Sequence, residues 1–293
     1  MTLRNFGNTG LRVSALGFGG SHIGGDDITN SDAANILHSA IDLGINLIDT
    51  ARSYDLSEER IGLALGARRK EIILSTKIGY GIAGFTDWTA EIISAGITEA
   101  LRLLRTDYLD IVHLHSCPLH TLKNSGVAEE LQREVQSGRI RIAAYAGDNE
   151  EVEWAAASGL FGSVQCSINI CDQRPISHTL PTAMEKQLGV IAKRPLGNAP
   201  WNRAAKPKGG TTLQNWERFH EMGMHDWGLD WADVALRFTA FTPGVHSCIV
   251  GTRNRDHLKA NAEAVQRGPL DAELVARIRD TFQTHGTDWK SGI

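Results

Sequence analysis

Residues 46–62 read NLIDTARSYDLSEERIG and contain the pattern that decides the fold. The apolar pair Leu47-Ile48 is typical of a buried strand, which places Asp49 at the end of that strand, and Ser57 begins a segment with helical polarity. The loop between them carries Tyr54. In parallel α/β folds, ligands and reactions lie at the carboxyl ends of the strands. An aspartate that ends a strand and a tyrosine in the next loop therefore predict a reactive site at this edge of a sheet.

The same alternation of strand and helix continues along the rest of the chain. Short apolar runs alternate with segments of helical spacing, several of which end at a glycine. The predicted strands are residues 13–18, 46–49, 71–77, 108–115, 140–146, 164–168, 190–193 and 247–250. The predicted helices are residues 29–43, 57–65, 89–104, 127–136, 150–158, 178–188, 231–239, 255–265 and 271–283, and residues 195–226 are a long connection.

Eight strands, each followed by a helix, predict a closed (β/α)8 TIM barrel of class α/β, formed by residues 1–293 as one domain. The turn Gly7-Asn8-Thr9-Gly10 predicts a short N-terminal β-hairpin that caps the barrel. The alternative is an open doubly wound sheet. It is disfavoured because the early glycines, Gly17 to Gly25, lack the G-x-G-x-x-G spacing that leads directly into a helix.

The composition is that of a globular protein with a sizeable core. Apolar residues make up 42% of the chain and charged residues 22%, and the net charge of -4 without a basic tract argues against nucleic acid or a membrane surface as a partner. The apolar runs are strand-sized, and the N-terminus lacks the features of a signal peptide. The cysteines form no CxxC pair, which predicts reduced thiols and a cytoplasmic location. They are Cys117, Cys166, Cys171 and Cys248.

Four polar residues share one predicted structural position. Asp49, Lys77 and His115 each end a strand, and Tyr54 follows Asp49 in the loop. Since consecutive strand ends are neighbours on a barrel rim, these side chains can converge. A tyrosine titrates near pH 10 and needs a neighbouring ammonium group to act as an acid at neutral pH, and a histidine can polarise a carbonyl. The group predicts proton transfer to a substrate oxygen.

These segments make the chain resemble an aldo-keto reductase. The matching stretches are GNTGLRVSALGFGG (7–20), IDTARSYDLSEERIG (48–62), LSTK (74–77), TDYLDIVHLHS (106–116), the strand with Gln165, RPL (194–196) and IVGTRNRDHLKAN (249–261). The resemblance implies a TIM-barrel enzyme that transfers hydride from NADPH to a small-molecule aldehyde or ketone. It implies that Tyr54 is the general acid, that Lys77 and Asp49 tune it, and that His115 orients the carbonyl.

The segment after the last strand is expected to hold the cofactor phosphate. A helix begins there, and its N-terminal amides can bind an anion, while Arg253 and Arg255 can add charge. The resemblance assigns the adenosine phosphate to this segment, with Arg253 and Asn261 as the first candidates. NADPH is thus the expected cofactor and NADH is possible. The remaining candidates of this segment are Gly251, Thr252 and His257.

The nicotinamide end departs from the resemblance at two points. The family commonly carries Ser-Asn after the fifth strand to bind the carboxamide, whereas this chain has Ala146-Gly147, which leaves Gln165, with Asp148 or Asn149 as substitutes. The stacking aromatic after the seventh strand is replaced by Lys193, followed by Arg194, Pro195 and Leu196. The two cations could reach the pyrophosphate or an acidic substrate, or pair with a carboxylate of the chain.

Two other functions are compatible with the sequence. The altered nicotinamide contacts suit a cofactor-binding regulatory or redox-sensor protein with little turnover, and His113 and His115 have the spacing of a metal-dependent hydrolase. The later strand ends offer no further metal ligand, so no metal is expected. Trp88 and Trp201 are candidates to line the substrate pocket. The sequence indicates neither the substrate nor the oligomeric state.

Overall fold

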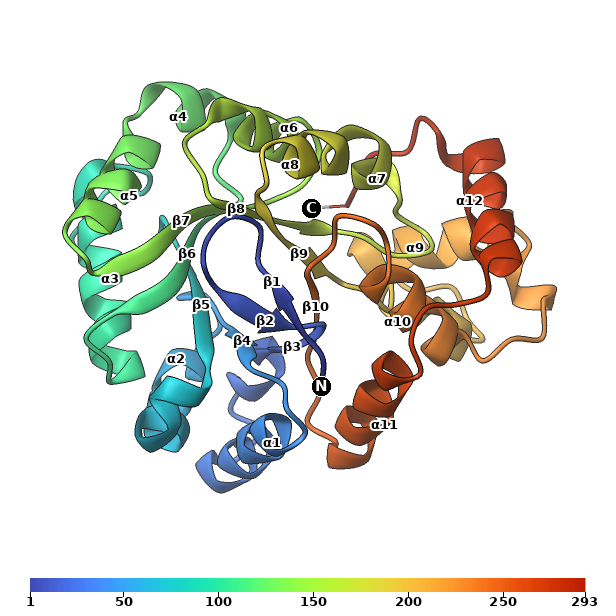
Figure 1. Ribbon diagram of the computed structural model, residues 1–293, viewed down its shortest axis with the longest axis horizontal. Helices are drawn as coiled ribbons and strands as arrows, with labels where there is room; N and C mark the ends of the chain where they lie inside the picture. Colours follow the sequence, from blue (N-terminus) through green and yellow to red (C-terminus); the bar gives the residue numbers. More distant parts are fainter. Residues whose placement is uncertain (293) are drawn as a thin grey trace.

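The computed structural model describes residues 1–292 and contains a closed barrel of eight parallel strands surrounded by helices (Figure 1). The strands neighbour one another in the order β10-β3-β4-β5-β6-β7-β8-β9, and β10 pairs with β3 to close the barrel. This confirms the predicted (β/α)8 architecture. The barrel strands are β3 (Leu16–Gly19), β4 (Leu47–Asp49), β5 (Ile73–Ile78), β6 (Leu109–His115), β7 (Ile140–Ala146), β8 (Ser163–Ser167), β9 (Gly189–Lys193) and β10 (Ser247–Val250).

Helices cover the outside of the barrel. Their apolar faces and the outward side chains of the strands form the main core, as in α1, where Ala33, Ile36 and Leu37 are buried. The helices are α1 (Asn30–Asp42), α2 (Ser57–Leu65), α3 (Ala90–Leu104), α4 (Leu119–Asn124), α5 (Val127–Gln136), α6 (Asn149–Ser158), α7 (Arg174–His178), α8 (Leu180–Glu185), α9 (Gly210–Glu221), α10 (Trp231–Ala240), α11 (Arg255–Gln266) and α12 (Ala272–Gly286).

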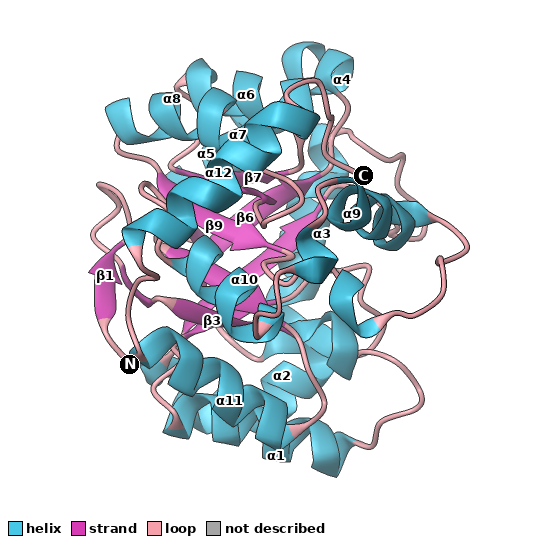
Figure 2. Ribbon diagram, turned by 90° about the vertical axis from the view of Figure 1, so that its right-hand side faces the viewer, coloured by secondary structure: helices cyan, strands magenta, loops and turns pink. Residues whose placement is uncertain are grey.

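The N-terminal hairpin closes one end of the barrel. Strands β1 (Leu3–Asn5) and β2 (Arg12–Ser14) are antiparallel, and Phe6, Leu11 and Val13 pack against the barrel interior. In Figure 2 strand β1 lies at one end of the barrel and the C-terminus near the other. The predicted strand 13–18 is divided between β2 and β3, because the chain passes from the hairpin directly into the barrel. The hairpin seals the end opposite the strand carboxyl termini, so the open end is the one where Asp49 and His115 lie.

Three segments differ from the prediction. Residues 195–226, predicted as a connection, contain α9, whose glycine-rich start obscures the helical spacing. The loop after β6 contains the short helix α4. The predicted helix 178–188 is replaced by α7 and α8, each of which has a proline in its first turn, a position where proline suits the start of a helix.

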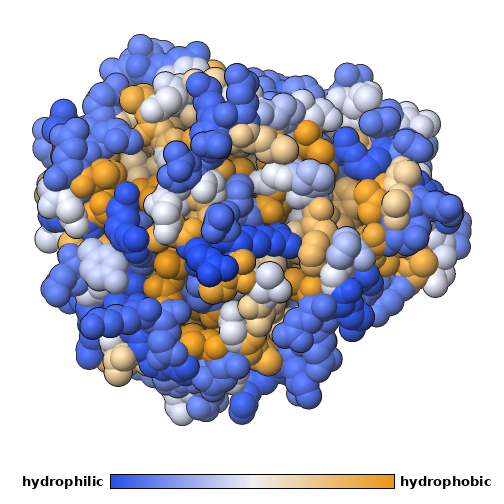
Figure 3. Space-filling view, viewed as in Figure 1, coloured by the Kyte–Doolittle hydropathy of each residue, from blue (hydrophilic) through white to orange (hydrophobic). Residues whose placement is uncertain are grey.

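The surface is mostly hydrophilic on the face seen in Figure 3, with hydrophobic side chains showing between charged ones. Within residues 1–292, no helix combines the length and the apolar character needed to cross a membrane.

Candidate active site

A pocket of about 600 Å³ opens at the carboxyl ends of the strands. It is lined by the four predicted catalytic residues, Asp49, Tyr54, Lys77 and His115. The other predicted residues that line it are Gln165, Lys193, Arg194, Pro195, Leu196 and Gly251, and residues not predicted there include His22, Ser116, Asn198 and Arg203.

Asp49 and Lys77 form a buried ion pair at the floor of this pocket. Lys77 Nζ lies 2.5 Å from Asp49 Oδ2 and donates a second hydrogen bond, of 2.8 Å, to the Thr50 carbonyl. The register of β4 and β5 places Asp49 opposite Ser75, two residues before Lys77, so both side chains point into the barrel. The ammonium group is thus fixed in position and in charge.

The remaining oxygen of Asp49 is held by two further donors. Ser75 Oγ donates to Asp49 Oδ1 at 2.7 Å, and Gln165 Nε2 donates to the same atom at 3.0 Å. The carboxamide contact predicted for Gln165 would therefore use its Oε1 atom or the second Nε2 hydrogen, since one Nε2 hydrogen is donated to Asp49.

The protonation states of the pair follow from these contacts. Burial alone would lower the pKa of Lys77, but its interactions with Asp49 and Tyr54 outweigh burial and the net shift is upward. Burial would likewise raise the pKa of Asp49, yet Lys77 and His113 bring the net shift downward. Both directions describe the same charged ammonium–carboxylate pair.

Tyr54 and His115 stand together beside this pair. Lys77 Nζ is 5.1 Å from the centre of the Tyr54 ring, and the Tyr54 and His115 rings meet edge to face at 6.0 Å. Burial, followed by the charge of Lys77, lowers the pKa of His115 to about 3, so its imidazole is neutral at pH 7. The site offers a phenol next to an ammonium group and a neutral imidazole, a set suited to proton transfer to a carbonyl oxygen.

Comparisons with known proteins agree with this geometry. The model of the aldo/keto reductase family matches residues 15–282. This chain belongs to the aldo/keto reductase family. It is an oxidoreductase, as are relatives along its whole length.

Two curated relatives and one solved structure illustrate the range of the family. L-galactose dehydrogenase from Arabidopsis thaliana is 28% identical over 99% of this chain and 98% of its own length. A probable voltage-gated potassium channel subunit beta from the same plant is 27% identical over 97% of each chain. The holo form of an aldo-keto reductase from Bacillus halodurans is 27% identical, with a TM-score of 0.84 over 96% of each chain.

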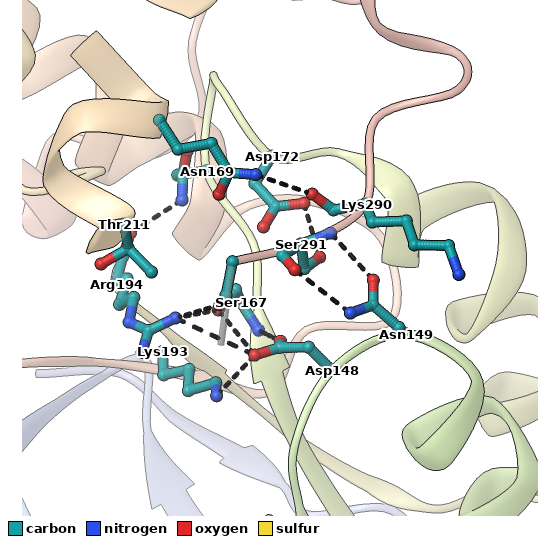
Figure 4. Close-up of polar contacts among 12 residues, drawn as sticks. Asp148, Asn149, Ser167, Asn169, Asp172, Lys193, Arg194, Thr211, Lys290 and Ser291 are labelled. Atoms are coloured by element: carbon teal, nitrogen blue, oxygen red, sulfur yellow. Dashed lines mark hydrogen bonds and ion pairs between the residues drawn. The ribbon is translucent and has the colours of Figure 1, made fainter. Parts of the chain in front are cut away.

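In the present chain, the two segments that depart from the family pattern, one after β7 and one at the end of β9, are joined by ion pairs. Lys193 Nζ lies 2.7 Å from Asp148 Oδ2, and Arg194 Nη1 lies 3.9 Å from the same oxygen (Figure 4). Asp148 also accepts a hydrogen bond of 2.7 Å from the Ser167 amide. The cation that replaces the aromatic is thus paired with a carboxylate next to Gly147, and Asp148 is not free to hold a carboxamide.

The side chain of Asn149 forms its hydrogen bonds with the C-terminal tail. The Asn149 side chain exchanges two hydrogen bonds with the Ser291 backbone, and Ser291 Oγ donates to Asp172 Oδ1 at 2.8 Å (Figure 4). Arg194 Nη1 donates to the Gly292 carbonyl at 2.8 Å. The C-terminal tail therefore fixes the positions of residues that follow β7 and β9. The sequence does not predict these contacts, because the partners are more than 90 residues apart in the chain.

Except for Gly251, which lines the pocket, the predicted phosphate-binding segment lies beside the pocket rather than in its wall. Arg253 donates to the His22 carbonyl at 2.7 Å and forms an ion pair with Asp27. The first amides of α11 are capped by the Asn254 side chain. Thr252, Arg253, His257 and Asn261 are not among the residues that line the pocket. Arg253 thus joins the loop after β10 to the loop after β3 at the edge of the pocket.

The two predicted tryptophans lie away from this pocket. Trp88 packs on the Tyr80 ring at 5.6 Å, and Trp201 belongs to a separate pocket with Phe219, His220 and Trp231. Sequence reasoning also missed Tyr80, which does not line the pocket but contacts a lining residue, because its Oη lies 3.0 Å from His115 Nδ1. Its only sequence signal is its place three residues after Lys77.

His113 is a buried residue of the barrel interior. Its Nε2 lies 3.1 Å from Ser75 Oγ, and burial lowers its pKa to about 4. Across residues 1–292, no group of three or more His, Cys, Asp or Glu side chains is arranged to hold a metal ion. The hydrolase alternative thus gains no support from His113 and His115.

Proposed function

We propose that this protein reduces the carbonyl group of a small molecule, with NADPH as the hydride donor and Tyr54 as the proton donor. The observation that carries the proposal is the buried Lys77–Asp49 pair, 2.5 Å apart, beside Tyr54 and His115 in one pocket. A fixed ammonium group next to a phenol is the arrangement that supports proton donation from the phenol at neutral pH.

The residues of the pocket fit a nicotinamide dinucleotide. Gly19 and Gly251 lie against each other, since a Cβ on Gly251 would come within 2.6 Å of the Gly19 carbonyl oxygen. The missing Cβ on Gly251 therefore lets the segments that follow β3 and β10 approach each other closely, and both glycines line this end of the pocket. Of the three guanidinium nitrogens of Arg194, only Nη1 donates hydrogen bonds to residues 1–292. Its Nε and Nη2 atoms can therefore donate to a pyrophosphate.

The roles of the side chains follow from their positions. When bound, the reduced nicotinamide supplies hydride to the carbonyl carbon. Tyr54 gives its hydroxyl proton to the carbonyl oxygen, and the Lys77 ammonium group stabilises the phenolate that remains. Asp49 keeps Lys77 charged, and the neutral His115 ring holds the carbonyl oxygen through a hydrogen bond. Water then returns a proton to Tyr54 and the alcohol leaves.

Titration with NADPH and NADH, followed by tryptophan fluorescence, tests the cofactor, because the chain has seven tryptophans. A panel of aldehydes and ketones then tests the reaction, with Tyr54→Phe as the control. We expect NADPH to bind, and we expect turnover that falls by roughly two to four orders of magnitude in Tyr54→Phe with cofactor binding unchanged. Absence of binding by either nucleotide would refute the proposal.

A second function, a cofactor-binding regulatory protein with little turnover, is favoured by one observation. Ala146-Gly147 and the Lys193–Asp148 pair replace side chains that grip and stack on nicotinamide in the family. Tight NADPH binding without reduction of any carbonyl in the panel would favour this second function over the reductase.

We also place the protein in a reducing compartment such as the cytoplasm, because its four cysteines are buried free thiols.

A further inference from the structure

Tyr80 contacts the imidazole of His115 in two ways. Its Oη lies 3.0 Å from His115 Nδ1, and the two rings stack at 5.7 Å with an angle of 23° between their planes. His115 Nε2 forms no hydrogen bond with residues 1–292 and belongs to a side chain that lines the pocket. The imidazole therefore has one nitrogen facing Tyr80 and the other available to a ligand.

The loop after β5 is built to hold Tyr80 in this place. Gly79, with a φ of 133°, is followed by a loop that returns to Trp88, whose amide donates to the Gly79 carbonyl at 2.9 Å. The Trp88 ring lies on Gly79 so closely that a Cβ there would come within 2.1 Å of it. Trp88 itself has a φ of 61°, which is uncommon for a bulky residue. Trp88 packs on Tyr80 and Tyr80 packs on His115, so the loop fixes both rings.

The direction of the Tyr80–His115 hydrogen bond follows from the chemistry of its partners. Tyr80 Oη has a second neighbour, Ser53 Oγ, at 3.3 Å. Its single proton can go to only one of them. A phenol is a stronger acid than an alcohol, and an imidazole lone pair is a stronger base than a hydroxyl oxygen, so an unprotonated Nδ1 takes the Tyr80 proton through the shorter contact. In this arrangement Ser53 Oγ donates to Tyr80 Oη, whereas with a proton on Nδ1 Tyr80 Oη would donate to Ser53 Oγ.

We propose that Tyr80 is a positioning residue that donates a hydrogen bond to His115 Nδ1 and thereby keeps the imidazole proton on Nε2. In a neutral imidazole one nitrogen carries the proton and the other has a lone pair that accepts a hydrogen bond. A donor placed at one nitrogen therefore keeps the proton on the other nitrogen. The Nε2–H group then points to the ligand side. This role rests on the proposed function, in which that group donates to the carbonyl oxygen.

Nuclear magnetic resonance of the ¹⁵N-histidine-labelled protein tests the tautomer without cofactor or substrate. Long-range ¹H–¹⁵N spectra distinguish Nε2–H from Nδ1–H, and His115→Gln assigns the His115 signals. We expect wild-type His115 to be the Nε2–H tautomer with a hydrogen-bonded Nδ1. In Tyr80→Phe, which keeps the ring and removes the hydroxyl, we expect the Nδ1 resonance to move and a measurable Nδ1–H population to appear.

Ser53→Ala is the matched control, because it removes the weaker neighbour of Tyr80 and leaves the Tyr80–His115 contact. Its His115 spectrum should match the wild type. An Nδ1–H tautomer in the wild type, or a Tyr80→Phe spectrum identical to it, would overturn the proposal, since Tyr80 would then accept from His115 or have no effect on it.

A kinetic comparison tests the consequence for catalysis. Tyr80→Phe should lower kcat for a carbonyl substrate about tenfold, the loss of one well-placed hydrogen bond, while the Kd for NADPH stays within about twofold. Ser53→Ala should stay within about twofold in both. If the wild type shows no turnover, the proposed function fails and the spectra alone decide the role of Tyr80. An equal loss in Tyr80→Phe and Ser53→Ala would instead indicate a structural role for the loop.

Discussion

Lys193 Nζ and Asp148 Oδ2 are 2.7 Å apart, and this ion pair joins the end of β9 to the residues that follow β7. Asp148 is 1% exposed, so the pair is formed by a carboxylate that water does not reach. Lys193 stands where the family commonly places a stacking aromatic, and Asp148 directly follows Gly147, which stands at the family's asparagine. Because Lys193 lines the pocket, this side of the pocket is bounded by an ion pair formed within the chain.

Lys193→Met should destabilise the fold because it leaves Asp148 as a buried charge without its main partner. Removing one member of a buried pair typically costs about 3–5 kcal/mol, and partial exposure of Lys193 places the expected loss near the lower end. Urea denaturation measures the free energy of unfolding. Lys206→Met, which breaks an exposed pair with Glu217, is the control and should cost less than about 1 kcal/mol. Equal losses in the two variants would contradict the buried character of the Lys193–Asp148 pair.

Lys77→Met should affect both activity and stability. Asp49 would lose its countercharge while still buried beside Ser75 and Gln165, so we expect a loss of roughly 3 kcal/mol or more in unfolding free energy. The proton donation proposed for Tyr54 would lose its neighbouring cation, and kcat should fall by at least about two orders of magnitude. Steady-state kinetics and thermal denaturation measure the two effects. The double variant with Asp49→Asn should recover stability without recovering kcat, and recovery of both would remove Lys77 from the mechanism.

Asp27→Asn should increase the affinity for NADPH and leave the affinity for NADH unchanged. Asp27 holds the Arg253 guanidinium, which is the group predicted to bind the 2′-phosphate, so the phosphate competes with a carboxylate. The pair is exposed, and the expected gain is therefore no more than about fivefold. Fluorescence titration gives both dissociation constants, with Arg253→Ala expected to weaken NADPH alone. Parallel changes for NADPH and NADH would show that Arg253 does not recognise the phosphate.

Asp172 should make the stability depend on pH. Burial, with the neighbouring charge of Asp148, raises the pKa of Asp172 to about 6 from an ordinary value of 3.8. Between about pH 4 and pH 6 the unfolded chain releases a proton that the folded chain keeps, so this residue lowers the unfolding free energy as the pH rises through that window. Asp172→Asn removes this contribution.

The test compares the unfolding free energy of Asp172→Asn and wild type across pH 4–7. The difference should grow in favour of the variant by at most about 3 kcal/mol as the pH rises. Asn can still accept the hydrogen bond from Ser291, which keeps the tail in place. A difference that does not change with pH would show that Asp172 titrates normally in the folded protein.

The fold could be predicted from the sequence because its signals are local. Apolar runs of strand length alternate with helical spacing, and several predicted bounds, such as 57–65, 127–136 and 140–146, match the structure. The sequence does not indicate helix α9, because its N-cap Gly209 and its first residues, Gly210-Thr211-Thr212, have poor helix propensity. Packing against α10 and α12 stabilises it instead.

The floor of the candidate site could also be predicted, since strand ends of a barrel must be neighbours. Asp49, Lys77 and His115 end adjacent strands, and the closed sheet brings them to one rim. Tyr80 could not be predicted, because its contact with His115 depends on the returning loop from Gly79 to Trp88. The position of Trp88 depends on the same loop, and that of Trp201 depends on packing of the segment after β9 against Phe219.

The sequence alone determined the barrel and the family, and it predicted the residues around the reactive edge. The barrel follows from periodicity, which each segment carries within itself, whereas the family follows from the resemblance of ordered motifs such as residues 48–62 and 249–261. Only the tertiary structure decided which charges meet: Lys193 with Asp148, Arg253 with Asp27, and the C-terminal tail with Asn149 and Arg194. Such pairings join residues far apart in the chain through side chains with many rotamers. For Asp148 and Asn149 the packed environment selects the partner, because a buried charge or polar group without a partner is costly. For the exposed pair of Arg253 and Asp27, the folded loops bring the two side chains together.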